Sequence, residues 1–210
     1  MSKNFANNYV YILDGRAYVN LTNRCHNACA FCIRNTGDGV AGSPLWLNKE
    51  PSADEVLASF EAVKKELKDN EVVFCGYGEP TERLDVLAEC AERIKAQGYK
   101  LRLNTNGLGD IVNGKSIAAS LKVFDTVSVS LNESSAEKYA AVTNSAYGLQ
   151  AFGAVIGFAS ECKKQGINTV LTVVDTIGGA DIDECRAVAE SLGLPLRVRE
   201  YISDNYGEGA

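Results

Sequence analysis

The sequence predicts an α/β fold in which six parallel strands and the helices between them form a partial (βα)6 barrel. Short runs rich in β-branched residues alternate with amphipathic stretches, a pattern typical of βα units. Several amphipathic stretches end at a glycine, the residue that most often closes a helix in a left-handed cap. With 210 residues and 46% hydrophobic content, the chain can build one sizeable core. We therefore expect a single domain over residues 1–210.

A short N-terminal hairpin is expected before the barrel. The run YVYIL is followed by Asp14-Gly15, a favoured pair for a two-residue turn, and then by RAYVNL. This hairpin would place one antiparallel strand beside the first parallel strand. The six expected parallel strands are Ala17–Thr22, Glu71–Cys75, Lys100–Leu103, Thr126–Ser130, Thr169–Val173 and Leu196–Tyr201.

Helices are expected between these strands. Ser52 and Glu55 fit a capping box, and apolar residues then recur on one face as far as Leu67. Later apolar faces cover residues 84–94, 149–159 and 182–192, the last with Asp181 as a candidate cap. Gly98, Gly166 and Gly193 mark the expected helix ends. Six strands close three quarters of an eight-stranded barrel and leave a side opening, and chemistry in such a fold gathers at the C-terminal strand ends.

The charge and hydropathy of the sequence bear on whether the protein binds nucleic acid and on where in the cell it is expected. The net charge is −6 and the pI is near 5.0, so there is no overall basic field for nucleic acid, which is not the expected partner. The first residues lack the basic start and apolar run of a signal peptide, and no stretch approaches ~18 consecutive apolar residues. We expect a cytoplasmic protein with no membrane association.

Three of the seven cysteines fall close together in RCHNACAFCIRN, at Cys25, Cys29 and Cys32. An odd count in a reducing compartment argues against a disulfide framework. Three thiolates on a short loop can curl around one inorganic core, and a four-iron cluster held by three cysteines keeps one open corner for another ligand. The alternative is a zinc site completed by His26 or another cysteine. The other cysteines stand singly, at positions where core packing is favoured: Cys75, Cys90, Cys162 and Cys185.

The pattern CxxxCxxC in CHNACAFC, together with six βα units and GYGEP after the second strand, resembles the radical SAM enzymes. The stretches VNLTNRCHNACAFCIRN, LWLNKEPS and CGYGEPT look most like the small subgroup linked with TatD-type hydrolases. The resemblance covers essentially the whole chain and implies a partial (βα)6 TIM-like barrel. It also implies that the three cysteines hold a [4Fe-4S] cluster whose fourth iron binds S-adenosylmethionine (SAM). Reductive cleavage of SAM would then give a 5′-deoxyadenosyl radical that abstracts hydrogen from a substrate.

The resemblance also implies which residues bind SAM. Tyr77, Gly78 and Glu79 of GYGEP would contact the methionine amino group of SAM. Tyr77 stands where the commoner motif has glycine, so its ring could instead face the substrate. Alternation along the fourth strand points Ser128, Ser130 and Asn132 toward the barrel interior. The alternatives are a turn leading into a capped helix for GYGEP, and ordinary turn chemistry for the strand ends. The implied cofactor-binding residues are Phe31, Tyr77, Gly78, Glu79, Asn104, Asn106, Ser128, Ser130, Asn132 and Arg199, the last a candidate for adenine or for a substrate acid.

Partners follow from the same chemistry. The enzyme would need an external one-electron reductant such as flavodoxin or ferredoxin, and a small molecule or partner protein as substrate. The sequence shows no further cysteine cluster, and we expect no auxiliary cluster. The long glycine-rich connection from Ile33 to Pro51 is expected to be a lid or substrate loop, or else a surface loop whose Trp46 packs on the core. Two rival classes are a non-catalytic iron-sulfur or zinc-binding module, and an electron-transfer protein, which would need a fully coordinated cluster.

Overall fold

A mostly parallel sheet forms the centre of the computed structural model, which describes residues 5–201. The main sheet has seven strands within this range, in the order β11-β10-β9-β8-β7-β3-β2. All neighbours pair in parallel except β2 and β3. The six predicted parallel strands are therefore confirmed; the ends of the predicted domain, residues 1–4 and 202–210, lie outside the described range. The strands are β2 (Val10–Leu13), β3 (Arg16–Val19), β7 (Glu71–Phe74), β8 (Lys100–Thr105), β9 (Thr126–Ser130), β10 (Asn168–Val174) and β11 (Leu196–Arg199).

The predicted hairpin is formed by β2 and β3. Asp14 and Gly15 both have positive φ, 51° and 77°, as a two-residue turn with the twist of a hairpin requires. Only glycine and a few short polar residues adopt these angles at small cost, which is why the Asp-Gly pair identified the turn. The hairpin places β2 at one edge of the sheet, and β11 forms the other edge.

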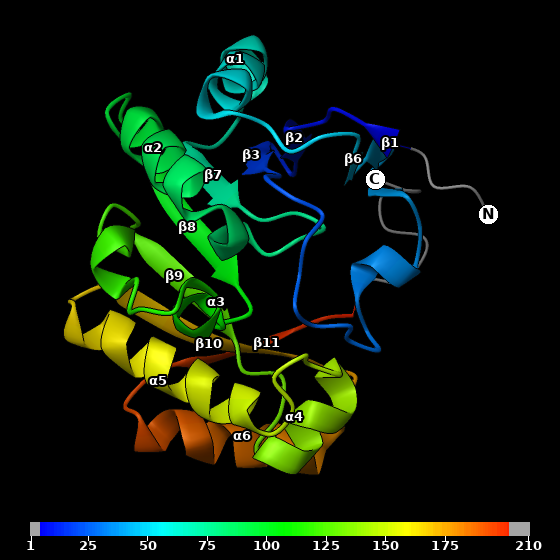
Figure 1. Ribbon diagram of the computed structural model, residues 1–210, viewed down its shortest axis with the longest axis vertical. Coiled ribbons are helices and arrows are strands. Elements are labelled where there is room, and N and C mark those ends of the chain that lie inside the picture. The colour runs from blue at the N-terminus through cyan, green and yellow to red at the C-terminus, as the bar shows by residue number, and fades with distance from the viewer. Residues whose placement is uncertain (1–4, 202–210) are drawn as a thin grey trace.

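Helices cover one side of the strands (Figure 1). The capping box is confirmed, because the Ser52 hydroxyl accepts from the Glu55 backbone N–H and the Glu55 side chain accepts from the Ser52 backbone. Gly98, Gly166 and Gly193 all have positive φ and end helices as predicted. The long helices are α1 (Ala53–Val63), α2 (Leu84–Lys95), α5 (Gln150–Lys164) and α6 (Gly179–Ser191), and the short ones are α3 (Gly109–Asn113) and α4 (Ala136–Thr143).

The expected cap of α6 was wrong. The helix begins at Gly179 with Gly178, at φ 63°, as its N-cap, so Asp181 lies within the first turn. Its carboxylate accepts a hydrogen bond from Lys138 of α4 at 2.6 Å. Gly178, with its positive φ, precedes the helix in the capping position that was expected for Asp181. Asp181 instead links α6 to α4 through its hydrogen bond with Lys138.

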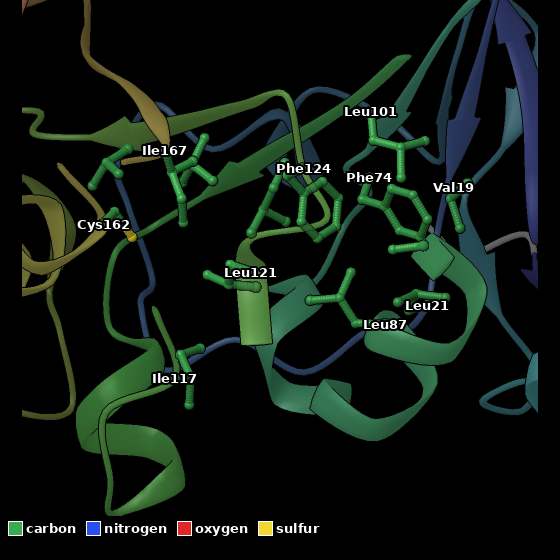
Figure 2. Packing of buried hydrophobic residues seen from close by; sticks show 14 of the residues in the cluster. Val19, Leu21, Phe74, Leu87, Leu101, Ile117, Leu121, Phe124, Cys162 and Ile167 are labelled. Atoms are coloured by element: carbon green, nitrogen blue, oxygen red, sulfur yellow. The ribbon is translucent and has the colours of Figure 1, made fainter. Parts of the chain in front are cut away.

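The main hydrophobic core lies between the sheet and the helices. Phe74 of β7 and Phe124 meet edge to face, with ring centroids 5.3 Å apart, and Leu87 of α2 packs beside them (Figure 2). Cys90, Cys162 and Cys185 belong to this core, and their predicted packing role is confirmed. Because side chains alternate along a strand, the residues between these core positions face the opposite, inner side of the sheet.

A second apolar cluster fills the inner side next to the hairpin. Val40, Leu45 and Trp46 pack there with Tyr11 and Tyr77. The segment that follows the cysteines forms three short strands, β4 (Gly39–Val40), β5 (Ser43–Pro44) and β6 (Trp46–Leu47), of which β6 pairs with β1 (Phe5–Ala6). This packing corresponds to the expected contact of Trp46 with the core.

Within residues 5–201, no helix combines the length and the apolar character that crossing a lipid bilayer requires.

Candidate functional site

The three clustered cysteines lie on the connection between β3 and the short 3-10 helix Ile33–Asn35, shown in blue in Figure 1. Two backbone hydrogen bonds of 2.9 Å attach this loop to α4, from Ala28 N–H to Thr143 O and from Ala30 N–H to Val142 O. The buried Asn27 amide also donates to the Tyr139 hydroxyl at 3.1 Å. The cysteine loop is thus held between the end of β3 and α4.

The three thiols are partly exposed and close enough to affect one another. Burial, together with charge on Cys32 and Cys25, raises the pKa of the Cys29 thiol to about 12. Burial, and then the charge of Glu79, raise the pKa of the Cys25 thiol. Three thiolates gathered in this way need a positively charged core to offset their charge. The donor set therefore fits a [4Fe-4S] cluster with one open corner, because soft thiolates are the ligands such clusters take.

Two nitrogen donors face these sulfurs. The Arg34 Nε–H points at Cys32 Sγ at 3.4 Å, while its two terminal nitrogens donate to the Asn23 and Asn27 carbonyls at 3.2 Å. The Asn106 side-chain amide lies 3.6 Å from Cys25 Sγ. Hydrogen bonds to cluster sulfurs favour electron uptake. Both donors are placed to do so here.

Glu79 of GYGEP is almost completely buried at 3% exposure. Its Oε1 accepts from the hydroxyl groups of Thr81 and Thr105 at 2.8 and 2.7 Å, and its Oε2 accepts from the Asn106 backbone N–H at 2.7 Å. Burial raises the pKa of this carboxyl group, although these hydrogen bonds lower it in part. Glu79 also caps the 3-10 helix Pro80–Arg83 through the Thr81 N–H, so the alternative of a turn leading into a capped helix is realised in the geometry. Contact with the SAM amino group stays a prediction.

The glycine of GYGEP is required by this chain's own backbone. A Cβ on Gly78 would lie 2.3 Å from the Thr22 carbonyl oxygen and 2.6 Å from that of Arg24. Tyr77 is buried, donates to the Gly37 carbonyl at 2.9 Å and meets Trp46 edge-on, with ring centroids 5.1 Å apart. Its ring therefore belongs to the second apolar cluster, which corrects the idea that it faces substrate.

The polar strand ends are partly as expected. Ser128 faces the inner side and is buried, and Ser130 is half-buried at the last position of β9. The alternation argument does not reach Asn132, because β9 ends at Ser130 and Asn132 has φ 62°. Asn132 is buried in a left-handed turn, a conformation that asparagine tolerates better than most residues.

Asn104 and Cys75 lie deeper in the interior. The side-chain oxygen of Asn104 is buried and has no hydrogen-bond partner in the described range. Burial raises the pKa of the Cys75 thiol, and the Asn104 amide lowers it in part. Cys75 is partly exposed, and it faces the inner side because it follows Phe74, which belongs to the main core. The packing role in the core that was expected for Cys75 from the sequence was therefore wrong. Arg199 is half-buried and close enough to lower the pKa of Cys75. Phe31 is half-buried in the cysteine loop.

The side chain of His26 contacts Glu82 and Tyr147 and not the cysteines. Its Nδ1 pairs with the Glu82 carboxylate and its ring stacks on Tyr147, with centroids 5.2 Å apart. No group of three or more His, Cys, Asp or Glu side chains in residues 5–201 is arranged to hold a single metal ion. The geometry thus gives no support to His26 as a zinc ligand.

Sequence reasoning missed three contributors to this region. Glu50 accepts from Thr22, Arg24 and Arg83 and so ties the cysteine loop to the GYGEP turn. Neither Arg34 nor Arg197 was assigned a role from the sequence. Glu50 carried no usable signal because its partners are distant in sequence. The position of Arg34, two residues after Cys32, is a signal that the motif itself contains.

A comparison with protein-family models matches residues 19–192 to the model described as the radical SAM superfamily. The chain belongs to the radical SAM superfamily. Members are enzymes that use a [4Fe-4S] cluster and SAM, so the expected class and cofactors are confirmed. The narrower resemblance to the TatD-linked subgroup stays a prediction. No curated protein sequence matches the chain.

Solved radical SAM structures share its fold. SuiB from Streptococcus suis, bound to S-adenosylmethionine, aligns at 19% identity and a TM-score of 0.60, over 89% of this chain and 38% of SuiB. A radical SAM methyltransferase from Sphaerobacter thermophilus aligns at 15% identity and 0.60, over 91% of this chain and 68% of that protein. The structure of anSMEcpe with bound AdoMet aligns at 19% identity and 0.60, over 89% and 51%. The chain therefore spans well under two thirds of SuiB and anSMEcpe.

Proposed function

We propose that this chain cleaves SAM reductively and uses the 5′-deoxyadenosyl radical to abstract hydrogen from a substrate. The observation that carries the proposal is the contact between the Asn106 amide and Cys25 Sγ at 3.6 Å. It joins the cysteine loop, the GYGEP turn and the end of β8 into one site at the C-terminal ends of the strands, where chemistry gathers in this fold. When bound, the cluster supplies one electron to the sulfonium group of SAM.

This chain's own residues hold and orient the reactants. Cys25, Cys29 and Cys32 would ligate three irons, and Ser130 and Asn132 at the end of β9 would bind SAM. The buried Glu79 fixes the Asn106 backbone and thereby the amide that faces Cys25. The second apolar cluster covers the inner side beside the hairpin and excludes water there.

The finer expectations on partners belong to the same proposal. An external reductant such as flavodoxin or ferredoxin would deliver the electron, and a cytoplasmic location agrees with seven free cysteines. The rival non-catalytic module differs in one respect. It would bind a cluster without cleaving SAM.

The test is anaerobic reconstitution of the full chain with iron and sulfide, followed by SAM and dithionite. We expect one four-iron cluster per chain and slow formation of 5′-deoxyadenosine without substrate, measured by chromatography. The control is the triple variant C25A/C29A/C32A, which should hold no cluster and form no product. Stoichiometric zinc without iron, or a reducible cluster that never cleaves SAM, would refute the proposal.

A further inference from the structure

Three arginines lie on the inner side of the sheet, away from the helices. Leu101 and Leu103 of β8 belong to the main core, so Arg102 between them faces the interior. On β11, Leu196 packs against the same core, which places Arg197 and Arg199 on the inner side by alternation. This strand is an edge of the sheet, so both residues line the side opening of the partial barrel.

The side chains of the three arginines extend into the interior, where the charges of Arg102 and Arg199 act on Arg197. Arg197 is exposed along the edge strand, yet its guanidinium group reaches Ser128, which is only 3% exposed, with a nitrogen-to-oxygen distance of 3.4 Å. Partial burial lowers the pKa of Arg197, and the charges of Arg102 and Arg199 lower it further. Arg199 and Arg102 both also act on the thiol of Cys75. The arginines therefore share one region of the interior.

Negative charge in this region is insufficient to balance them. Glu71 pairs with Arg102 at 3.0 Å, but it also lies 3.5 Å from Arg16. Within residues 5–201 no salt bridge joins Arg197 or Arg199 to a carboxylate, although the charge of Glu71 also acts on Arg197. The Arg102 side chain is 13% exposed and its Nε is buried without a hydrogen-bond partner in the described range. Like charges held together with unpaired donors are costly unless a bound anion offsets them.

Polar groups complete a wall around this point. Asn104 and Ser128 stand opposite one another in the β8–β9 register, and the Asn104 amide interacts with Cys75, the residue that follows β7. Ser130, two residues beyond Ser128 on the same strand, lies about 7 Å closer to the strand ends, given the ~3.3 Å rise per residue of a parallel strand. Arg197 is in register with Ser130 through Thr172, and its guanidinium group reaches back to Ser128. A group held there would lie next to Ser128, deeper in the barrel than Ser130.

We propose that Arg102, Arg197 and Arg199 form an anion site that holds a carboxylate or phosphate group of the substrate. The guanidinium fork matches both of these oxyanions in two-point geometry, and its charge is permanent. Assignment of the anion to the substrate rests on the proposed function, whereas the anion site itself does not. Arg102, Arg197 and Arg199 would act jointly in this site, and the substrate would be anionic.

The test uses the full chain as purified, with inorganic phosphate and succinate as separate probes at ionic strength fixed with sodium chloride. Calorimetric titration and thermal melting compare wild type with R197Q/R199Q. We expect one probe to bind wild type and raise its melting temperature, and the double variant to bind it at least tenfold more weakly. The better probe distinguishes a phosphate from a carboxylate substrate. The matched control is R186Q, an exposed arginine of α6 on the helix side, which should bind like wild type.

Stability without any anion gives an independent readout. Because the substitution removes like-charge repulsion, R197Q/R199Q should melt no lower than wild type, whereas loss of purely structural contacts would lower the melting temperature. The single variant R199Q provides the same comparison if the double variant folds poorly. Equal binding by R197Q/R199Q and R186Q, or no response of wild type to either probe, overturns the proposal. It is also overturned if R197Q/R199Q weakens SAM binding to the reconstituted cluster as much as it weakens phosphate or succinate binding. Neither probe experiment needs the cluster or SAM, so failure of SAM cleavage in wild type is a separate result.

Discussion

The side-chain amide of Asn106 lies 3.6 Å from Cys25 Sγ, although the two residues are 81 positions apart in the chain. The Asn106 backbone N–H donates to Glu79 at 2.7 Å, and its side-chain oxygen accepts from the Leu108 N–H at 2.9 Å. Three separate interactions thus fix one side chain against the first cysteine. We therefore propose Asn106 as a positioning residue for a cluster held by Cys25.

Replacing Asn106 with alanine should lower the reduction potential of the reconstituted cluster while leaving its iron content unchanged. The N–H donor favours the more negative, reduced form. A hydrogen bond that stabilises this form by about 1 kcal/mol corresponds to about 40 mV for one electron. A redox titration followed by electron paramagnetic resonance measures the shift. Asn113→Ala is the matched control, because that amide holds the Thr81 and Gly109 carbonyls without facing a thiol. Equal potentials in the two variants would contradict the role.

Gly78→Ala should destabilise the fold by about 1–3 kcal/mol, the usual cost of overpacking. The added Cβ would overlap the Thr22 and Arg24 carbonyl oxygens, which are backbone atoms that cannot rotate away. Since Arg24 adjoins Cys25, we also expect less iron after reconstitution. Urea denaturation and iron analysis measure both effects. Gly153→Ala is the control: its Cβ would meet nothing within 4 Å inside α5, so helix propensity should stabilise that variant by about 0.5–1 kcal/mol.

The strands and long helices could be predicted because their signals are local. Val72 to Phe74 form a run of β-branched and aromatic residues, Val127 and Val129 alternate with serines, and Asp14-Gly15 permits the φ angles of a tight turn. The short helix α4 and the small strands β4, β5 and β6 were not predicted. Few residues take part in each, and contacts across the chain decide their conformation.

Within the site, residue type indicated which side chains gather there but not the direction of every one. The cysteine spacing predicts Cys25, Cys29 and Cys32 as cluster ligands, and this stays a prediction. The ring of Tyr77 was misjudged because its partner, Trp46, lies 31 positions away, counted from the residue numbers, in a segment whose packing the sequence leaves open. Asn132 was assigned by strand alternation, although its left-handed turn ends that alternation.

Arg34→Gln should make the cluster easier to lose. Arg34 connects Cys32 Sγ to the Asn23 and Asn27 carbonyls, and charged hydrogen bonds are worth roughly 1.5–3 kcal/mol each. We expect iron loss to a chelator to be at least tenfold faster than in wild type, measured anaerobically by absorbance. Arg24→Gln removes the same charge from the same loop, but that side chain is 54% exposed and pairs with Glu50. Equal rates of loss for both variants would show that overall charge, and not the contact with sulfur, is responsible.

Substitution of Ser130 and Asn132 distinguishes most directly between a SAM site and ordinary strand-end structure. The variant that we propose is Ser130→Ala with Asn132→Gly, because alanine at φ 62° would add backbone strain that glycine avoids. If both side chains bind SAM, its affinity should fall at least tenfold, since each lost hydrogen bond to a charged ligand is worth roughly 1.5–3 kcal/mol. The cluster should remain, because no thiol is changed. SAM titration of the cluster's electron paramagnetic resonance signal, with thermal melting beside it, measures both quantities. Asn144→Gly, another left-handed asparagine, at the end of α4, controls for the backbone change. A lowered melting temperature with unchanged SAM affinity would remove both residues from the SAM site, because the side chains would then act only on the fold.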